Sequence, residues 1–285
     1  MSTSAGRLLS RGSRAPRRRL LHLALLGWAV ASLLPLLWTL SASLQSNQEI
    51  YSGIHLIPRH LELGNYTQAW TQAHFSTYFK NSVIYTVTIV AGVLIISSLA
   101  AYAFARMRFP LKNLVFYLFL IFLTFPLPGS FIPLYVLLVN LGLIDTPLGY
   151  ILPMINAGLP VAIFILRSFF EEIPREIEES ARIDGATRLQ VYRLIALPLA
   201  KPALATITIF TALSVWNEFL FALVVFSDQQ RMPLQVGLMT FQGTFFSQYG
   251  LMMAATTITM VPALAIYLVF QRFIVRGVMA GAVRG

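Results

Sequence analysis

Six long apolar segments run through this chain and constrain its fold more than any other feature. A helix needs roughly 20 predominantly apolar residues to cross a bilayer. Only 11% of the residues are charged, about half the fraction usual in soluble domains. The sequence therefore predicts an all-α polytopic membrane protein with six transmembrane helices. The segments cover about residues 20–43, 79–105, 114–138, 150–170, 203–226 and 251–274.

The first segment has an alternative interpretation as a secretory signal, because Ser41-Ala42-Ser43 resembles a cleavage site. The apolar core of a signal peptide is about 7–15 residues long. The segment 20–43 is longer than that, so we expect a retained membrane span.

Positive charge predicts the orientation of the spans. If the N-terminus is cytoplasmic, 18 of the 21 lysines and arginines fall on the cytoplasmic side, leaving Arg59, Lys80 and Arg231 outside. Cytoplasmic loops of membrane proteins carry an excess of Lys and Arg. We therefore expect a multi-pass protein with both termini in the cytoplasm. Because the cations lie between apolar runs, they do not indicate a nucleic-acid partner.

This topology divides the chain into a basic tail, a first span, an outer loop, a membrane-spanning core and a second tail. Prolines and glycines interrupt the third and fourth spans, which points to broken helices. Non-helical backbone at membrane depth is tolerated where it lines a cavity or packs inside protein. The five parts cover residues 1–19, 20–43, 44–78, 79–274 and 275–285. The interrupting residues are Pro126, Pro128, Gly129, Pro133, Pro153, Asn156, Gly158 and Pro160.

One acidic residue, Glu218, lies well inside a predicted span, within Trp216-Asn217-Glu218-Phe219. A carboxylate at membrane depth is by default a functional-site hypothesis. The alternative is a structural hydrogen-bonding network that holds this helix to its neighbours, and the two roles are compatible. A proton relay is poorly supported, because the central spans offer no second buried ionisable group.

Enzyme chemistry is not indicated by any motif in the chain. The sequence contains no P-loop pattern, no H-E-x-x-H pair and no cysteine, so it predicts neither ATP binding through a P-loop nor a metal site. We expect a non-enzymatic chain that binds no cofactor itself.

The charged loop at 171–201 contrasts with the apolar chain around it. Its first half is amphipathic, with Ile173, Ile177 and Ala181 at four-residue spacing. Asp184-Gly185 should end the first helix, and the hydroxyl of Thr187 should cap the second. Connections between packed helices are usually about 2–8 residues long, so this loop is longer than a connection requires. The pattern favours a docking element for another protein over a loop lying on lipid headgroups.

The loop also contains a recognisable motif. Glu179-Ser180-Ala181, then Gly185, then Ile195-Ala196-Leu197-Pro198 resemble the EAA loop of binding-protein-dependent ABC importer permeases. Ser180 departs from the second Ala of that pattern, but it is also small. Further stretches are similar to the carbohydrate-importer group, in particular to the shorter six-span permease of maltose-type systems. They are Asn65-Tyr66, Asn81-Ser82, AFARMRFP at 103–110, WNEF at 216–219 and GVMAGAVRG at 277–285.

The resemblance implies the type I ABC importer permease fold in the bacterial inner membrane, with 171–201 as a cytoplasmic coupling-helix hairpin. The implied partners are a second permease, two cytoplasmic ATPase subunits that hold ATP and Mg, an extracytoplasmic solute-binding protein, a sugar and membrane lipid. In such permeases the last outer loop, here 227–250, reaches the binding protein, and the tail 280–285 reaches the ATPase interface. The implied ATPase-coupling residues are Ile177, Glu179, Ala181, Asp184, Gly185, Ala186, Tyr192, Ile195 and Pro198. The implied translocation-path residues are Trp216, Asn217, Glu218 and Asn156.

Three alternatives to a sugar importer subunit stay open at this point. One is a permease of the same class for another solute, such as a glycerol phosphate ester. Another is an ion-coupled secondary transporter, whose uptake would survive loss of the ATPase. The third is a scaffold without a path of its own.

Overall fold

The computed structural model describes residues 14–71, 74–121, 127–241 and 248–282, and every regular element within these ranges is helical. Residues 1–13 and 283–285 of the predicted tails, and 242–247 of the predicted outer segment, lie outside them. The elements are α1 (Arg14–Ala42), α2 (Asn47–Ser52), α3 (Gly64–Thr71), α4 (Phe75–Arg106), α5 (Lys112–Ile121), α6 (Leu127–Asn140), α7 (Pro147–Glu172), α8 (Arg175–Ile183), α9 (Arg188–Val191), the π-helix η2 (Tyr192–Ala196), α10 (Leu197–Leu199), α11 (Lys201–Trp216), α12 (Leu220–Val225), α13 (Leu234–Gly237), the 3-10 helix η3 (Leu238–Phe241) and α14 (Tyr249–Ala282).

Within the described residues, each of the six predicted apolar runs contains helix, and four or five candidate spans result. Four helical stretches are long and apolar enough to cross a membrane alone: Leu21–Ala42, α4, α7 and Tyr249–Val269. A fifth candidate span is the bent pair Arg188–Leu199 and Lys201–Trp216, whose halves meet at 72°. The chain is therefore an all-α polytopic membrane protein.

The proline-rich runs behave in two different ways. Within the described residues, the third run forms two shorter helices, α5 and α6, and α6 continues through Pro133, so an interruption at that residue was wrongly expected. Pro126 lies outside the described residues. The fourth run is the single helix α7, which continues through Pro153 and Pro160, so the expected interruption there is wrong. Thr146 caps the start of α7 by accepting a hydrogen bond from the N–H of Gly149 at 3.1 Å. Membrane helices tolerate internal proline where neighbouring groups compensate for the lost backbone bond.

A first compact unit comprises residues 1–69 and 243–257. Within it, the residues that resemble a cleavage site are buried at the end of α1. Ser43 Oγ lies 2.6 Å from Tyr66 Oη, and the side-chain amide of Asn65 donates to Ser43 O at 3.0 Å. These partners give Ser43 a structural role, and the retained first span stays a prediction.

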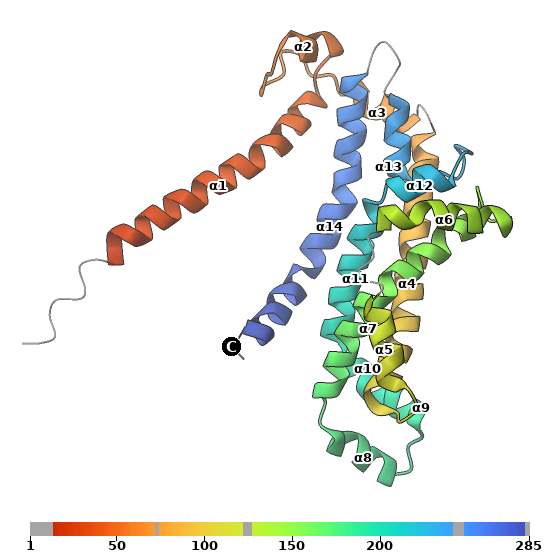
Figure 1. Ribbon diagram of the computed structural model, residues 1–285. Helices are drawn as coiled ribbons and strands as arrows, with labels where there is room; N and C mark the ends of the chain where they lie inside the picture. The colour runs from red at the N-terminus through yellow and green to blue at the C-terminus, as the bar shows by residue number, and fades with distance from the viewer. Residues whose placement is uncertain (1–13, 72–73, 122–126, 242–247, 283–285) are drawn as a thin grey trace, which may run out of the picture. The chain divides into compact units, whose positions relative to one another are not determined.

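A second compact unit comprises residues 70–242 and 258–285. In it, α4 packs along α7 and α11, while α8 lies at one end of these helices and α12 and α13 lie at the other (Figure 1). Small residues allow α4 and α7 to approach closely. A Cβ added to Gly92 would lie 2.4 Å from Ile155 Cδ1, and one added to Gly158 would lie 2.9 Å from Val93 Cγ2.

Candidate functional site

The loop at 171–201 folds into a tight helical hairpin. After α8, Gly185 adopts a φ of +91°. The N–H of Gly185 donates to Arg182 O at 3.1 Å, and the N–H of Ala186 donates to Ala181 O at 2.9 Å. These two bonds form a Schellman motif, which favours glycine at its left-handed position. The predicted role of Gly185 in ending this helix is confirmed.

The second arm of the hairpin starts with a capping box. Thr187 Oγ1 accepts from the N–H of Gln190 at 3.3 Å, and Gln190 Oε1 accepts from the N–H of Thr187 at 2.7 Å. The predicted cap at Thr187 is therefore confirmed. Pro198 lies in α10, just before the 72° bend at Ala200.

The hairpin exposes apolar side chains around its turn. Ile183 is 86% exposed, and Ile177 and Leu189 are also exposed. Asp184 and Gly185, between the two arms, are exposed as well. Sequence reasoning did not single out Ile183, although it lies directly before the Asp184-Gly185 turn. The exposed turn is the part of the hairpin that is free to contact another protein.

Tyr192, in contrast, points into the helices of its own chain. Its Oη lies 2.8 Å from Ser98 Oγ, and its ring centroid lies 5.2 Å from that of Tyr102. Ile195 is half-buried. Tyr192 therefore fastens the hairpin to α4, and its implied part in ATPase coupling stays a prediction.

Glu178 is the functional-site candidate that sequence reasoning missed. It lies in the charged helix α8 but is only 1% exposed. Its Oε1 lies 2.8 Å from Nε of Arg106, the last residue of α4, and its Oε2 lies 3.8 Å from Arg182. Tyr102 Oη donates to Glu178 Oε2 at 3.3 Å. A cation at the very end of a long apolar helix was the one available signal for this buried pair.

The fifth apolar run breaks between α11 and α12, at Asn217, Glu218 and Phe219. Glu218 Oε1 accepts from the N–H of Phe221 at 2.6 Å, and Oε2 accepts from the N–H of Ala222 at 3.0 Å. Tyr150 Oη, from α7, donates to Oε2 at 3.2 Å. The carboxylate thus satisfies backbone groups that the break exposes, which supports the structural alternative for Glu218.

The other residues predicted for the path divide into buried and exposed ones. Trp216 is buried, donates from Nε1 to Thr259 O at 3.1 Å and packs edge-on against Phe79. Asn217 and Asn156 are exposed. Asn156 lies six residues after Tyr150 on α7, about 9 Å along the helix axis. Of the four residues predicted for the path, the two asparagines are therefore the exposed ones.

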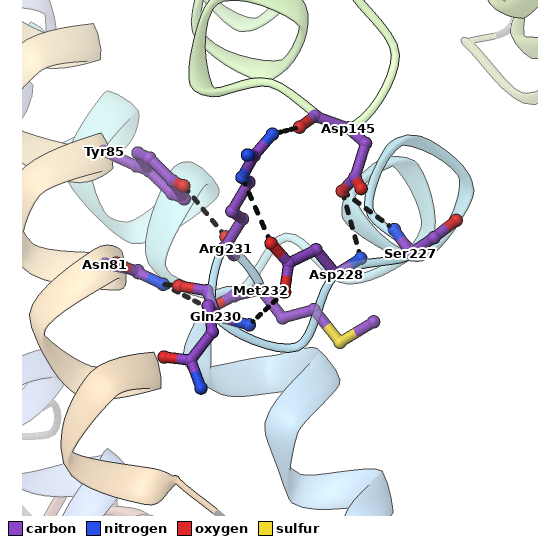
Figure 2. A network of polar contacts seen from close by, with 8 residues as sticks. All are labelled: Asn81, Tyr85, Asp145, Ser227, Asp228, Gln230, Arg231 and Met232. Carbon is purple, nitrogen blue, oxygen red and sulfur yellow. Dashed lines mark hydrogen bonds and ion pairs between the residues drawn. The ribbon is translucent and has the colours of Figure 1, made fainter.

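A polar network joins the segment between α12 and α13 to α4 and to the start of α7 (Figure 2). Asp145 Oδ1 accepts from the N–H groups of Ser227 and Asp228, each at 3.1 Å. Arg231 donates to the carbonyl of Asp145 and pairs with Asp228. We call this the Asp145 network; it consists of Asn81, Tyr85, Asp145, Ser227, Asp228, Gln230, Arg231 and Met232.

On the α4 side of the Asp145 network, two side chains of α4 donate hydrogen bonds to carbonyl groups of the same segment. The side-chain amide of Asn81 donates to Gln230 O at 2.9 Å and to Met232 O at 3.0 Å (Figure 2). Tyr85 Oη donates to Arg231 O at 2.8 Å. Residues 227–232 are therefore fixed from α4 and from the turn before α7, an arrangement that the sequence alone did not predict.

Comparisons with known proteins agree with these features. The family described as binding-protein-dependent transport system inner membrane component matches residues 92–280. NgcG, the permease of a diacetylchitobiose uptake system in Streptomyces coelicolor, is 37% identical over 97% of this chain and 93% of its own. AraQ, an arabinooligosaccharide transport permease of Halalkalibacterium halodurans, is 36% identical over 90% and 93%. A crystal structure of a bacterial ABC transporter that imports alginate matches with a TM-score of 0.80 and 28% identity, over 91% of this chain and 98% of that one.

The family match contains α7, the hairpin and α11, and the relatives cover nearly the whole chain. This protein therefore belongs to the inner membrane components of binding-protein-dependent transport systems, the permeases of ABC importers.

Proposed function

We propose that this chain pairs with a second permease to form the path by which an ATP-driven importer moves a sugar or oligosaccharide across the inner membrane. The observation that carries the proposal is the capped hairpin with its exposed turn, on a chain of this family. The sugar class is supported by the relatives, whose names specify diacetylchitobiose and arabinooligosaccharides. The chain is a transport component and not an enzyme.

In this proposal the hairpin couples the permease to an ATPase subunit, which holds ATP and Mg. Ile177 and Ile183 enter a cleft of that subunit, because they are exposed apolar side chains at the turn. Glu179 is exposed on the same helix and sets the orientation at the rim of the cleft. Gly185 allows the turn to stay compact. A second ATPase subunit binds the partner permease in the same way.

The orientation of the proposal follows from charge. Both termini and the hairpin lie in the cytoplasm, because this places 18 of the 21 lysines and arginines there. The segment 227–250 then faces the solute-binding protein on the opposite side, with residues 227–232 held in place by the Asp145 network.

In this proposal the exposed asparagines line the translocation path. Asn217 and Asn156 offer amide groups that suit sugar hydroxyls, which both donate and accept hydrogen bonds. Trp216 and Glu218 maintain the break beside them through their internal hydrogen bonds. ATP-driven movement of the hairpin opens this region alternately to the two sides of the membrane.

The substrate class is tested on the cognate binding protein by thermal unfolding. The panel is diacetylchitobiose, arabinooligosaccharides, alginate oligosaccharides and glycerol 3-phosphate. One saccharide should raise the melting temperature, since a ligand that binds only the folded state stabilises it. A response to glycerol 3-phosphate alone would replace the sugar with a phosphate ester.

Coupling is tested by replacing Gly185 with Val. A left-handed residue with a side chain costs about 1–2 kcal/mol, so the turn should rearrange and ATPase subunits should no longer co-purify. Gly142→Val is the matched control, because Gly142 also has a positive φ, +67°, and as at Gly185 an added Cβ would meet no atom within 4 Å. Sugar-stimulated ATP hydrolysis at the wild-type rate in Gly185→Val would reject this role of the hairpin.

A further inference from the structure

We propose that the buried ion pair between Arg106 and Glu178 locks the hairpin to α4 and α7, so that these elements move as one body during transport. The inference rests on the proposed function, since it concerns how movement of the hairpin reaches the membrane-spanning helices. Arg106 and Glu178 are positioning residues in this scheme, because they act by holding α8 to the ends of α4 and α7.

Glu178 is the anchoring residue of α8. Among the nine residues of that helix it alone is buried, whereas its neighbours Ile177 and Glu179 are exposed. A buried carboxylate is costly unless a charged partner and hydrogen bonds compensate it. The hairpin therefore has two sides: Glu178 faces its own chain, and the turn at Ile183 faces outward.

Arg106 joins three elements through one guanidinium group. It ends α4, its Nε lies 2.8 Å from Glu178 Oε1, and its side-chain exposure is 7%. The same guanidinium donates to the carbonyl of Ile173, the residue directly after α7. Displacing α8 from α4 would therefore break the ion pair and leave each charged side chain without its partner.

Aromatic rings enclose the pair and extend the contact. Tyr102, one turn before Arg106 on α4, donates to Glu178 Oε2 at 3.3 Å. Its ring centroid lies 5.6 Å from that of Phe170 of α7, in an edge-on arrangement, and 5.2 Å from that of Tyr192 of the hairpin, in a tilted one. Both arms of the hairpin are thus fastened to the same stretch of α4.

The ion pair fixes the position of α8 along α4 more strictly than apolar packing alone would. Apolar side chains can slide past one another with little change in buried area, whereas a buried pair is stable in one arrangement only. Breaking it leaves an unpaired charge, which is strongly unfavourable. A buried polar pair can in this way fix the register between two packed elements.

Movement of the hairpin would then reach the far end of the same helices. Asn81 and Tyr85 on α4 hold residues 230–232, and Asp145, just before α7, holds Ser227 and Asp228. Between these two ends, the helices α4 and α7 pack closely against each other at Gly92 and Gly158. One body therefore extends from the Arg106–Glu178 pair to the Asp145 network.

The first test uses the complete importer, reconstituted in vesicles with the sugar selected by the melting-temperature screen. Glu178→Gln removes the charge but keeps the side-chain shape. We expect the ATPase subunits to stay bound while sugar transported per ATP hydrolysed falls by roughly 2- to 30-fold. Glu176→Gln is the matched control, since Glu176 is exposed on the same helix, and it should retain the wild-type ratio. A wild-type ratio in Glu178→Gln, or loss of the ATPase subunits from it, would overturn the proposal.

The second test replaces the ion pair with a covalent link. The chain contains no cysteine, so the double variant Arg106→Cys with Glu178→Cys can be bridged by a bifunctional thiosulfonate reagent. Bridging should restore the transport-to-hydrolysis ratio, and reduction should abolish it again. The two single variants cannot be bridged and should not respond. A bridged protein that stays uncoupled, or variants that do not assemble at all, would contradict a locking role.

Failure of the proposed function gives a different result in these experiments. A wild-type complex that hydrolyses ATP without moving sugar would reject the importer assignment before any variant is compared. A coupled wild type with an unaffected Glu178→Gln variant would reject the locking role alone.

Discussion

At the scale of single residues, the break in the fifth apolar run raises the question of how its backbone N–H groups find hydrogen-bond acceptors. Between Trp216 and Leu220 the chain leaves the helix, so the first N–H groups of α12 have no helical acceptor. Within a membrane, each unsatisfied group of this kind costs several kcal/mol. Glu218 accepts two of these N–H groups and the hydroxyl of Tyr150. A carboxylate suits the position because it is an acceptor on both oxygens.

Glu218→Gln should therefore destabilise the protein. The amide has one acceptor oxygen, so at least one of the three donors loses its partner, at a cost of about 1–3 kcal/mol. The melting temperature in detergent should fall. Asn217→Ala should leave the melting temperature nearly unchanged, because Asn217 is exposed, but should raise the apparent KM for the sugar. An unchanged melting temperature together with lost transport in Glu218→Gln would instead assign the carboxylate to the path.

At the scale of elements, the Asp145 network shows how a segment without regular structure can be held rigidly. Residues 226–233 lie between α12 and α13, and their backbone groups bond to side chains from elsewhere in the fold (Figure 2). Asp145 has a φ of +58°, a conformation that Asn and Asp tolerate better than other residues with side chains. An aspartate at this position thus suits both the turn before α7 and the hydrogen bonds from Ser227 and Asp228.

Two replacements of Asp145 separate these roles. Asp145→Gly keeps the left-handed turn but removes the acceptor, so the amides of Ser227 and Asp228 should exchange hydrogen faster, by roughly the factor of ten that 1.4 kcal/mol gives. Asp145→Asn keeps an acceptor oxygen and tolerates the φ, so its exchange should stay close to wild type. Hydrogen–deuterium exchange read by mass spectrometry measures both. Equal protection in the glycine variant would show that the α4 contacts alone hold the segment.

At the scale of the whole molecule, the features predictable from sequence are those set by neighbouring residues. Apolar length located the helical runs, and Gly185 and Thr187 located the hairpin turn, because caps act within one helical turn. The buried role of Glu178 depends on Arg106, 72 positions earlier, and the fixed segment after α12 depends on Asn81, 149 positions before Gln230. Such partners leave no local pattern. The unbroken α7 also escaped prediction, because the contacts that compensate its prolines are tertiary.

Charge predicts the orientation of the whole molecule, and cysteine labelling can test it. The chain has no cysteine of its own, so single replacements give clean signals. Ile183 in the hairpin is 86% exposed and Ile57 in the 44–78 loop is 82% exposed. In spheroplasts producing this chain without its ATPase, an impermeant maleimide should label Ile57→Cys at once. Ile183→Cys should react only after permeabilisation, because the positive-inside rule places the hairpin in the cytoplasm. Immediate labelling of Ile183→Cys would put the hairpin out of reach of any ATPase, and the coupling proposal would fail with it.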